Sequence, residues 1–539
     1  MKLFRAGILA VVSFVAACAP KPPAAPPPAP APAAVAADKP VLVVQVLVDQ
    51  LRADLLDRYA DLFTGGFKRL HDRGHNYINA SHEHAATETA VGHTTLATGV
   101  FPSRHGIIAN QWREMSNGQW VLVSNVGDST VQIVGQPGRF GASPHYNQRS
   151  GFAEWLVAAD PRSIVASVSG KDRGAIQPAA HVKSAYVYWF DSYAGRYVTS
   201  TYYRSSDPAW ITQFNDSQLP THLADSVWNQ TVSPANFTRS DPDTATYEAD
   251  RVHTFFPHKF SGEYARQVPL TFWQWWEATP YLDRATLELA KSAVTSLNLG
   301  KDDAPDYLNV SLSATDRIGH SFGPLSREQL DNLLRLDREL GDFFDFLDAT
   351  VGRDKWTMML TADHGVLDAP EDLIREGKYG HRLTIAENTE LERLRLHADS
   401  AADKRAAARE LVASLKKMSI VADAWTQEQL MQSQPDSFAV LVRHSLFPGR
   451  EGERFSREGV EFRFIPGILS LPTGSSHGQV YWYDRHVPMI FMGPGIQPAR
   501  DPAHAATIDF APTFSSILRI PFPTDLDGKV LTAVVPPLP

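Results

Sequence analysis

The strongest structural signal in this chain is VLVVQVLV at residues 41–48, followed at once by Asp49. The run is almost entirely apolar and rich in β-branched residues, which is typical of a strand buried on both faces of a sheet. In sheets of parallel strands, ligands bind beyond the carboxyl ends of the strands. The run therefore predicts a central strand, and Asp49 marks the edge where a functional site is expected.

Further strands and helices alternate along the chain, which predicts an α/β fold with a mostly parallel central sheet flanked by helices. A long amphipathic helix is expected up to Leu347, and it opens with the capping-box pattern Ser326-Arg-Glu-Gln. Apolar residues spaced from Leu51 to Phe67 predict another amphipathic helix. The remaining strands are expected at residues 163–169, 307–313, 357–360 and 487–492.

The N-terminus reads as a processing signal. Lys2 and Arg5 precede an apolar stretch at 6–17, which is too short to span a bilayer as a mature helix. Cys18, the only cysteine, follows Val-Ala-Ala as in a bacterial lipobox. We expect residues 1–18 to be an export signal, and we favour a lipid anchor at Cys18 over an ordinary cleavage site.

Residues 19–40 hold nine Pro and nine Ala, so they predict an extended linker. The catalytic domain is expected over 41–539. Segments 174–300 and 383–470 depart from the alternation and are interpreted as insertions. In the first, three close tryptophans could form a substrate platform, but large aromatics at this spacing more often pack in a core: Trp273, Trp275 and Trp276.

Composition excludes several classes of protein. The chain has 539 residues and a formal net charge of −9, so it lacks the basic excess of nucleic-acid and polybasic membrane binders. A single cysteine excludes a disulfide framework, a Cys-rich zinc site and an iron–sulfur cluster within one chain. Any metal must be bound by carboxylates and by some of the 19 histidines.

Three aspartates and three histidines stand at strand or loop ends, and together they could supply two sets of three ligands for a pair of zinc ions. A lone Asp at a strand end is usually a helix cap, and a lone His is usually structural, so only the joint pattern carries weight. Asp316 and His320 are four residues apart and share one face of a helix. The six candidates are Asp49, Asp316, His320, Asp363, His364 and His477.

Two further features suit phosphoryl chemistry. Thr89 is expected at the N-terminus of a short helix, where the helix dipole favours an anion, although it could be a simple N-cap. Lys171 and Arg173 follow a strand and could point the same way, as a phosphoryl dianion requires, although such a turn is often only solvated.

These motifs resemble the alkaline phosphatase superfamily, in its type I phosphodiesterase/nucleotide pyrophosphatase-like group. The Lys171-Asp-Arg173 pair is most similar to monomeric bacterial alkaline phosphatases with a threonine nucleophile. The similarity runs from Val41 to the C-terminus. It is carried by Glu88-Thr89-Ala90-Val91-Gly92-His93, Thr98-Gly99, Pro102-Ser103-Arg104-His105-Gly106-Ile107 and Asn110.

The resemblance implies hydrolysis of small-molecule phosphate monoesters through a phosphothreonine at Thr89. Asn110, Lys171 and Arg173 would bind phosphoryl oxygens. One zinc ion would be bound by Asp49, Asp363, His364 and the Thr89 oxygen, and a second by Asp316, His320 and His477. It also allows an additional structural ion such as Ca²⁺, and it implies a monomer. The N-terminal signal predicts an exported, periplasmic protein, which the lipid anchor at Cys18 would place at the outer membrane. Other histidines are interpreted as structural or as neighbours of the ligands: His82, His84, His93, His105 and His381.

The main alternative is a phosphodiesterase or nucleotide pyrophosphatase of the same superfamily, which would share Thr89 and the six ligands. Lys171 and Arg173 favour monoesters, which carry more negative charge. A sulfatase is disfavoured because it needs a formylglycine made from Cys or Ser. A cofactor-independent phosphoglycerate mutase is disfavoured because enzymes of that kind use serine. A non-catalytic periplasmic lipoprotein that binds metal or phosphate fits the composition but leaves Thr89 without a role.

Overall fold

The computed structural model describes residues 33–117, 119–223, 226–267, 271–432, 436–452, 456–457 and 459–537. The predicted export signal, the anchor at Cys18 and most of the linker lie outside these residues. The compact unit over residues 31–539 is built on a nine-stranded sheet. Among the described helices, none combines the length and the apolar character that a membrane span requires.

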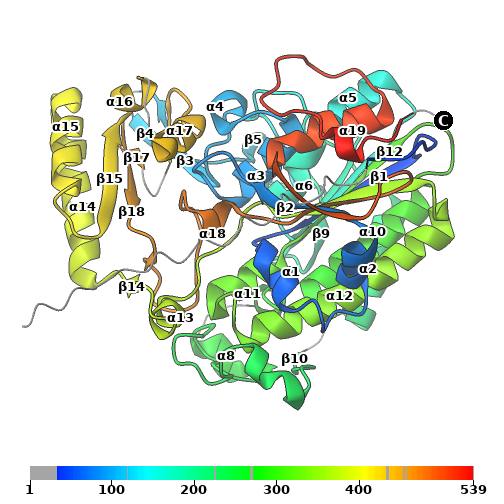
Figure 1. Cartoon of the computed structure of the whole chain (residues 1–539), viewed down its shortest axis with the longest axis horizontal. Helices are drawn as coiled ribbons and strands as arrows, with labels where there is room; N and C mark the ends of the chain where they lie inside the picture. The colour runs from blue at the N-terminus through cyan, green and yellow to red at the C-terminus, as the bar shows by residue number, and fades with distance from the viewer. Residues whose placement is uncertain are drawn as a thin grey trace, which may run out of the picture. The chain divides into compact units, whose positions relative to one another are not determined.

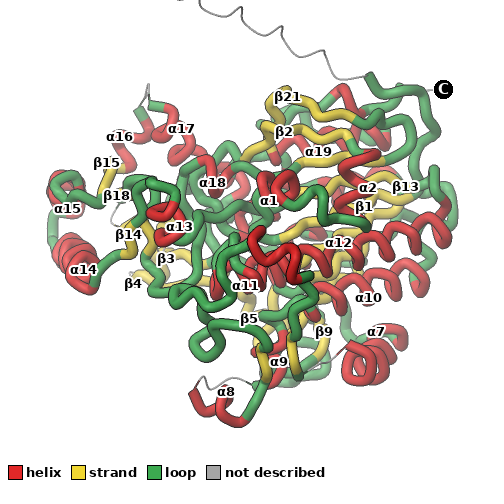
Figure 2. The backbone as a smooth tube through the Cα atoms, turned by 60° about the horizontal axis from the view of Figure 1, so that its bottom comes forward, coloured by secondary structure: helices red, strands yellow, loops and turns green. Residues whose placement is uncertain are grey.

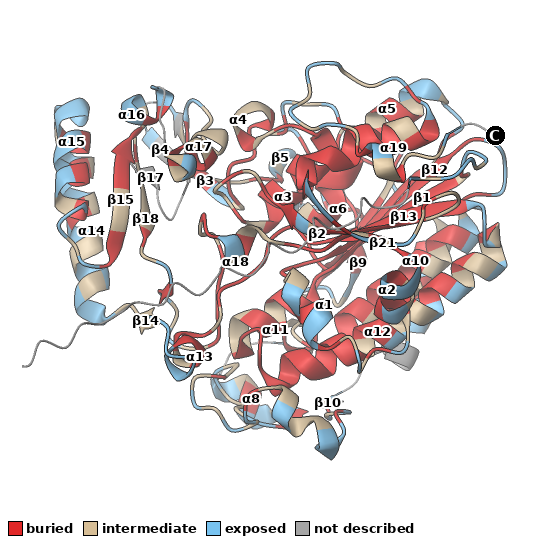
Figure 3. Ribbon diagram, viewed as in Figure 1, coloured by how far each residue is buried: buried red, intermediate tan, exposed pale blue. Residues whose placement is uncertain are grey.

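Strand β1 (Leu42–Val48) lies inside the sheet, parallel to β12 (Asp306–Leu312) on one side and to β13 (Trp356–Thr361) on the other. Its side chains alternate between two apolar cores. Val44 and Val46 join the core that includes α10 (Tyr281–Ser296) and α12 (Arg327–Leu347). Val43 and Leu47 join the core of the opposite layer, formed by α5 (Phe152–Ala159), α6 (Asp172–Ala179) and α19 (Phe510–Leu518). The strand is thus buried on both faces, as predicted (Figures 1 and 3).

The sheet has the order β21-β2-β20-β13-β1-β12-β7-β8-β9. Strands β13, β1, β12, β7 and β8 run parallel, which confirms the mostly parallel α/β fold. Strand β20, within the predicted segment 487–492, runs antiparallel to β13, so its end lies at the opposite edge from Asp49. The strands not yet bounded are β2 (His75–Ser81), β7 (Val165–Ser169), β8 (Tyr186–Asp191), β9 (Arg196–Val198), β20 (Met489–Met492) and β21 (Ala499–Ala506).

The single helix predicted between Leu51 and Phe67 is wrong. The structure has α1 (Ala53–Arg58) and α2 (Gly66–Arg73) instead. The chain breaks because the Asp337 carboxylate accepts hydrogen bonds from backbone amides before and within α2, and because Gly65 lies against α12. A Cβ on Gly65 would stand 2.3 Å from the Asp337 carbonyl oxygen.

Helix α12 begins after Ser326, whose hydroxyl accepts a hydrogen bond from the Gln329 amide at 3.0 Å. The reciprocal half of the predicted capping box is not formed. The Gln329 side chain donates to the Thr315 carbonyl oxygen at 2.8 Å, and so links α12 to the helix that carries Asp316.

The segment 174–300 is not wholly an insertion, because β8, β9 and α10 belong to the central sheet and its cover. Trp275 and Trp276, on α9 (Phe272–Trp276), are buried in the same core, as the sequence favoured, and Trp273 packs against it.

Within 383–470, helices α14 (Ile385–Ser400) and α15 (Lys404–Leu415) form a layer with strands β15 (Val421–Thr426) and β18 (Val460–Phe464) (Figure 2). These elements share an apolar cluster of their own.

Candidate active site

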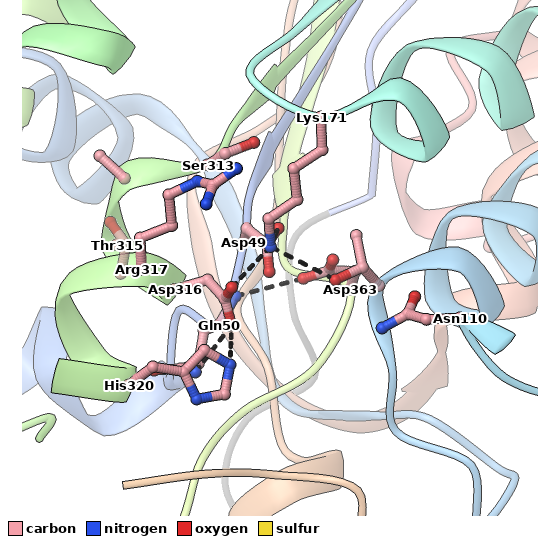
Figure 4. Close-up of polar contacts among 12 residues, drawn as sticks. Asp49, Gln50, Asn110, Lys171, Ser313, Thr315, Asp316, Arg317, His320 and Asp363 are labelled. Atoms are coloured by element: carbon pink, nitrogen blue, oxygen red, sulfur yellow. Dashed lines mark hydrogen bonds and ion pairs between the residues drawn. The ribbon is translucent and has the colours of Figure 1, made fainter. Parts of the chain in front are cut away.

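Four neighbouring parallel strands deliver the candidate residues to one edge of the sheet. Asp49 directly follows β1, and Asp363 follows β13 by two residues. Lys171 stands between β7 and α6, and Asp316 lies on α11 (Ala314–Phe322), which follows β12. Because the carboxyl ends of parallel strands share an edge, residues far apart in sequence converge here (Figure 4).

The first group of ligand atoms comes from Asp49, Asp363 and His364, which are fully buried. The His364 ring donates from Nδ1 to the Gly365 carbonyl oxygen at 3.0 Å, so Nε2 carries the lone pair. That lone pair faces Asp49 Oδ1 at 3.5 Å. Neither of these two atoms has a hydrogen-bond partner in the part of the chain that the structure describes. Two facing acceptors in a buried space fit a cation between them.

The second group comes from Asp316, His320 and His477. The Nε2 atoms of the two rings lie 3.1 and 3.4 Å from Asp316 Oδ1. Their Nδ1 atoms donate to the carbonyl oxygens of Ser475 at 3.0 Å and Thr87 at 2.6 Å. All three histidines of the two groups therefore share one tautomer, fixed by a backbone carbonyl. This is the orientation that metal-binding imidazoles adopt.

The loop that carries His477 depends on a glycine. Gly474 has a φ of +58°, and a Cβ there would stand 2.1 Å from the His320 carbonyl oxygen. Only glycine lets this loop approach α11 closely enough for His477 to join Asp316. Each group thus offers three oxygen or nitrogen ligands, which fits a divalent metal ion with positions left open for substrate.

Lys171 links the two groups. Its Nζ lies 2.6 Å from Asp49 Oδ2 and 2.5 Å from Asp316 Oδ2 (Figure 4). The same atom lies 3.5 Å from Thr89 Oγ1. Burial, together with the charges of Asp316 and Asp363, holds the pKa of Asp49 well above its usual range. Burial also acts to raise the pKa of Asp316, but His320 and Lys171 outweigh it and hold that pKa well below its usual range.

Thr89 is the first residue of α3 (Thr89–Thr98) and is buried. One turn later, the His93 Nδ1 donates to the Thr89 carbonyl oxygen at 2.8 Å and lies 3.2 Å from Asp363 Oδ2. A Cβ on Gly92 would stand 2.1 Å from the Asp363 carbonyl oxygen, so this helix can approach β13 only with glycine there. These contacts place Thr89 beside the first group of ligands.

Asn110 and Arg173 line a polar cavity of about 310 Å³ near the start of α3, together with Glu88. The Asn110 side-chain Oδ1 accepts a hydrogen bond from the Ala90 backbone amide at 2.9 Å, and the Asn110 backbone amide donates to Glu88 Oε2 at 2.7 Å. The side-chain amide of Asn110 and the guanidinium of Arg173 therefore share one polar space.

Lys171 and Arg173 do not point the same way, as the sequence suggested they could. Lys171 is the extended residue that precedes α6, whereas Arg173 lies in the first turn of that helix. Lys171 therefore reaches the two ligand groups while Arg173 lines the polar cavity.

The other histidines have structural contacts. His82 bonds the Ala362 carbonyl oxygen, and burial lowers the pKa of His82 to about 4. His105 bonds Thr95, and burial lowers the pKa of His105 to about 3. His84 is buried beside His82, with its pKa well below the usual range because of burial.

His381 pairs with Glu387 at 2.8 Å, away from both ligand groups.

Gln50 is a residue of the site that the sequence reasoning missed. It has a φ of +68°, its amide donates to Asp363 Oδ1 at 3.2 Å, and its Nε2 donates to Asp316 Oδ1 at 2.8 Å. Gln50 thus holds one carboxylate of each group. Its position next to Asp49 was the only available signal.

A third group of metal-ligand type, Asp250, His253 and His258, was also absent from the sequence predictions. The His253 Nδ1 donates to Asp250 Oδ2 at 2.9 Å, while Nε2 accepts from the Lys259 amide at 3.3 Å. Both ring nitrogens of His253 are thereby committed to the protein. The buried His258 Nδ1, by contrast, has no hydrogen-bond partner among the described residues.

Comparison with known proteins gives a consistent result. Residues 43–450 match the family model for type I phosphodiesterase/nucleotide pyrophosphatase. The chain is 32% identical to the alkaline phosphatase PafA of Elizabethkingia meningoseptica, over 93% of this chain and 95% of that protein. It is 33% identical to the alkaline phosphatase PhoV of Synechococcus elongatus, over 92% of each chain.

The crystal structure of wild-type PafA superposes with a TM-score of 0.84 at 30% identity, and covers 93% of this chain and all of that one. This agreement confirms the predicted fold. A second crystal structure of PafA carries substitutions at a threonine, an asparagine, a lysine and an arginine, in that order along its chain.

Proposed function

This chain belongs to the type I phosphodiesterase/nucleotide pyrophosphatase family, and from that premise we propose that it is an alkaline phosphatase. It would hydrolyse phosphate monoesters through a phosphothreonine at Thr89 and release inorganic phosphate. Two relatives that match over more than nine-tenths of the chain are named alkaline phosphatases, which supports a phosphatase activity.

One observation carries the proposal. A buried threonine hydroxyl, a buried ammonium group and two groups of metal-ligand atoms meet at the carboxyl edge of the sheet. Lys171 Nζ stands within hydrogen-bonding distance of Asp49, Asp316 and Thr89, so a phosphoryl group next to Thr89 would also lie next to Lys171. Positioned cations of this kind stabilise the charge of a phosphoryl transition state.

The residues of the chain would act in two steps. Thr89 Oγ forms a bond to phosphorus as the bond to the leaving oxygen breaks, which gives a phosphothreonine and the free alcohol. A water molecule then attacks the phosphothreonine, releases phosphate and restores the Thr89 hydroxyl. Lys171, Arg173 and the Asn110 amide would bind the oxygens of the transferred group.

The two ligand groups fit zinc, because each combines carboxylate oxygens with oriented imidazole nitrogens. Such a pair of ions supplies Lewis-acid stabilisation of the phosphoryl oxygens and lowers the pKa of a bound hydroxyl. One ion would be held by Asp49, Asp363, His364 and the Thr89 oxygen, and the other by Asp316, His320 and His477.

Phosphodiester hydrolysis is the second candidate, because the matching family model is named for phosphodiesterases and nucleotide pyrophosphatases. Lys171 favours the hypothesis of monoester hydrolysis. A monoester dianion offers more charge and more free oxygens to a buried ammonium than a diester monoanion does.

The test is covalent capture of phosphate on Thr89. We expect rapid acid quench during turnover to trap phosphate on the peptide that contains Thr89, and Thr89→Ala to trap none. Thr295→Ala is a matched control, since Thr295 is exposed and its hydroxyl bonds only within its own helix. Phosphate trapped on another residue of the Thr89→Ala protein would refute the assignment.

A further inference from the structure

A second cavity adjoins the site, and its wall is mainly apolar, in contrast to the polar cavity described above. It has a volume of about 410 Å³ and is lined by residues of α14, α15 and β18. Figure 1 labels these three elements. Apolar side chains dominate its wall, and they come from all three elements and from the segment before α14: Leu383, Leu391, Leu411, Leu415, Phe462 and Phe464. Organic ligands bind in cavities of this size and character.

This cavity reaches the second ligand group. Ser476 and His477 line it, and the Nε2 of His477 also lies 3.4 Å from Asp316 Oδ1. His477 is therefore shared by the wall of this cavity and by the second ligand group.

The in-line geometry of phosphoryl transfer predicts on which side of the phosphorus atom the leaving oxygen departs. Thr89 lies beside the first group, through the contacts of His93 with the Thr89 carbonyl oxygen and with Asp363. In phosphoryl transfer the attacking and leaving oxygens lie roughly in line on opposite sides of phosphorus. With Thr89 at the first group, the leaving oxygen would depart on the side of Asp316 and His477.

The two cavities also differ in the charged side chains that line them. In the apolar cavity, the lining residues Glu392 and Arg395 form an ion pair with each other at 3.0 Å, so their charges cancel. The polar cavity is lined instead by charged and polar groups, namely Arg173, Asp172, Glu88 and Asn110, and the recorded Arg173–Asp172 ion pair is 3.5 Å long. The first cavity therefore suits an uncharged organic group, and the second suits polar atoms of the substrate.

We propose that the cavity among α14, α15 and β18 binds the leaving group of the substrate, and that the enzyme prefers monoesters of aryl or long-chain alkyl alcohols. This inference rests on the proposed function, since it names the substrate class of the same site. Leu391 is the residue to change, because it faces the cavity from α14 and is only half-buried.

The experiment compares 2-naphthyl phosphate with methyl phosphate, which share the phosphoryl group and differ in the apolar part. Leu391→Trp fills the cavity, so kcat/KM for 2-naphthyl phosphate should fall by roughly 10- to 100-fold, the range for lost contacts in an apolar pocket. The value for methyl phosphate should stay unchanged. Leu396→Trp is the control, on the same helix but exposed to solvent, and should alter neither substrate.

Equal losses on both substrates, or no loss on either, would overturn the inference and leave the cavity as a packing feature of the α14–β18 layer. Failure of the proposed function is a separate result, in which the wild-type protein hydrolyses neither monoester. In that event, binding of 2-naphthol decides the inference. Binding by the wild type that Leu391→Trp abolishes supports it, and binding that is absent or unaffected by Leu391→Trp refutes it.

Discussion

The edge of the central sheet and the α14–β18 layer meet at His477 but are built in opposite ways. At the sheet edge, fully buried polar residues such as Asp49 and Asp363 are held by strands that pack on both faces. In the α14–β18 layer, a small apolar cluster surrounds a cavity, and α14 exposes most of its residues. If the proposed function is correct, the sheet edge carries out the reaction and the α14–β18 layer selects the substrate.

The largest effect should follow loss of a ligand at the sheet edge. Asp363→Ala removes a carboxylate from the first group, so the metal content should fall by about one ion per chain. Loss of a residue that merely orients a ligand costs ~10- to 100-fold, so loss of the ligand itself should lower kcat/KM by more than roughly 10³-fold. Elemental analysis and kinetics on methyl phosphate measure both.

Asp302→Ala is the matched control, since Asp302 is exposed and precedes β12, at the opposite end of that strand from Asp316. Chelation should remove the activity of the wild type as Asp363→Ala does, and zinc should restore only the wild type. Retention of both the metal and the activity in Asp363→Ala would contradict the proposal that the sheet edge, and not the α14–β18 layer, carries out the reaction.

The next largest effect should follow the loss of Lys171 or of Arg173. Removal of either cation should lower monoester hydrolysis by on the order of 10²- to 10³-fold, as for other positioned charges in a site. Diester hydrolysis should fall less, because a diester offers less charge to lose. Kinetics of Lys171→Ala and Arg173→Ala on matched aryl monoesters and diesters measure this, with Lys417→Ala, at an exposed site, as the control.

Losses of the same size on both substrates would mean that these cations do not select monoesters. The phosphodiesterase reading would then become the stronger one.

The parts of the site that the sequence predicts are those that short patterns encode. Asp49 is visible because it ends an apolar run, and the motif that begins at Glu88 marks Thr89. The sequence does not reveal that the helix predicted from Leu51 to Phe67 is interrupted before Gly66. Asp337, which is far along the chain, causes that interruption. Nor does it show how Gln50 turns, because its positive φ is set by contacts with Asp316 and Asp363.

The separation of Lys171 from Arg173 has a similar origin. Sequence spacing predicts which residues are neighbours, but the start of α6 decides where each side chain points. The direction of β20 likewise depends on its pairing with β13, which no local pattern specifies.

The smallest effect on catalysis should come from the interior of the α14–β18 layer. Leu394 is buried in the cluster of that layer and does not line the cavity. Leu394→Ala should destabilise the layer by about 2–5 kcal/mol, as other large-to-small core substitutions do. Hydrogen exchange in α14 and α15 should accelerate, while kcat on methyl phosphate should remain unchanged, because the sheet edge keeps its own packing. Leu360→Ala, in β13 next to Asp363, is the counterpart. It removes the same side chain from the sheet core, and should lower kcat because the strand that carries Asp363 loses support. If Leu394→Ala lowered kcat on methyl phosphate as much as Leu360→Ala, the layer would be part of the catalytic framework, and the division of labour between the two regions would be wrong.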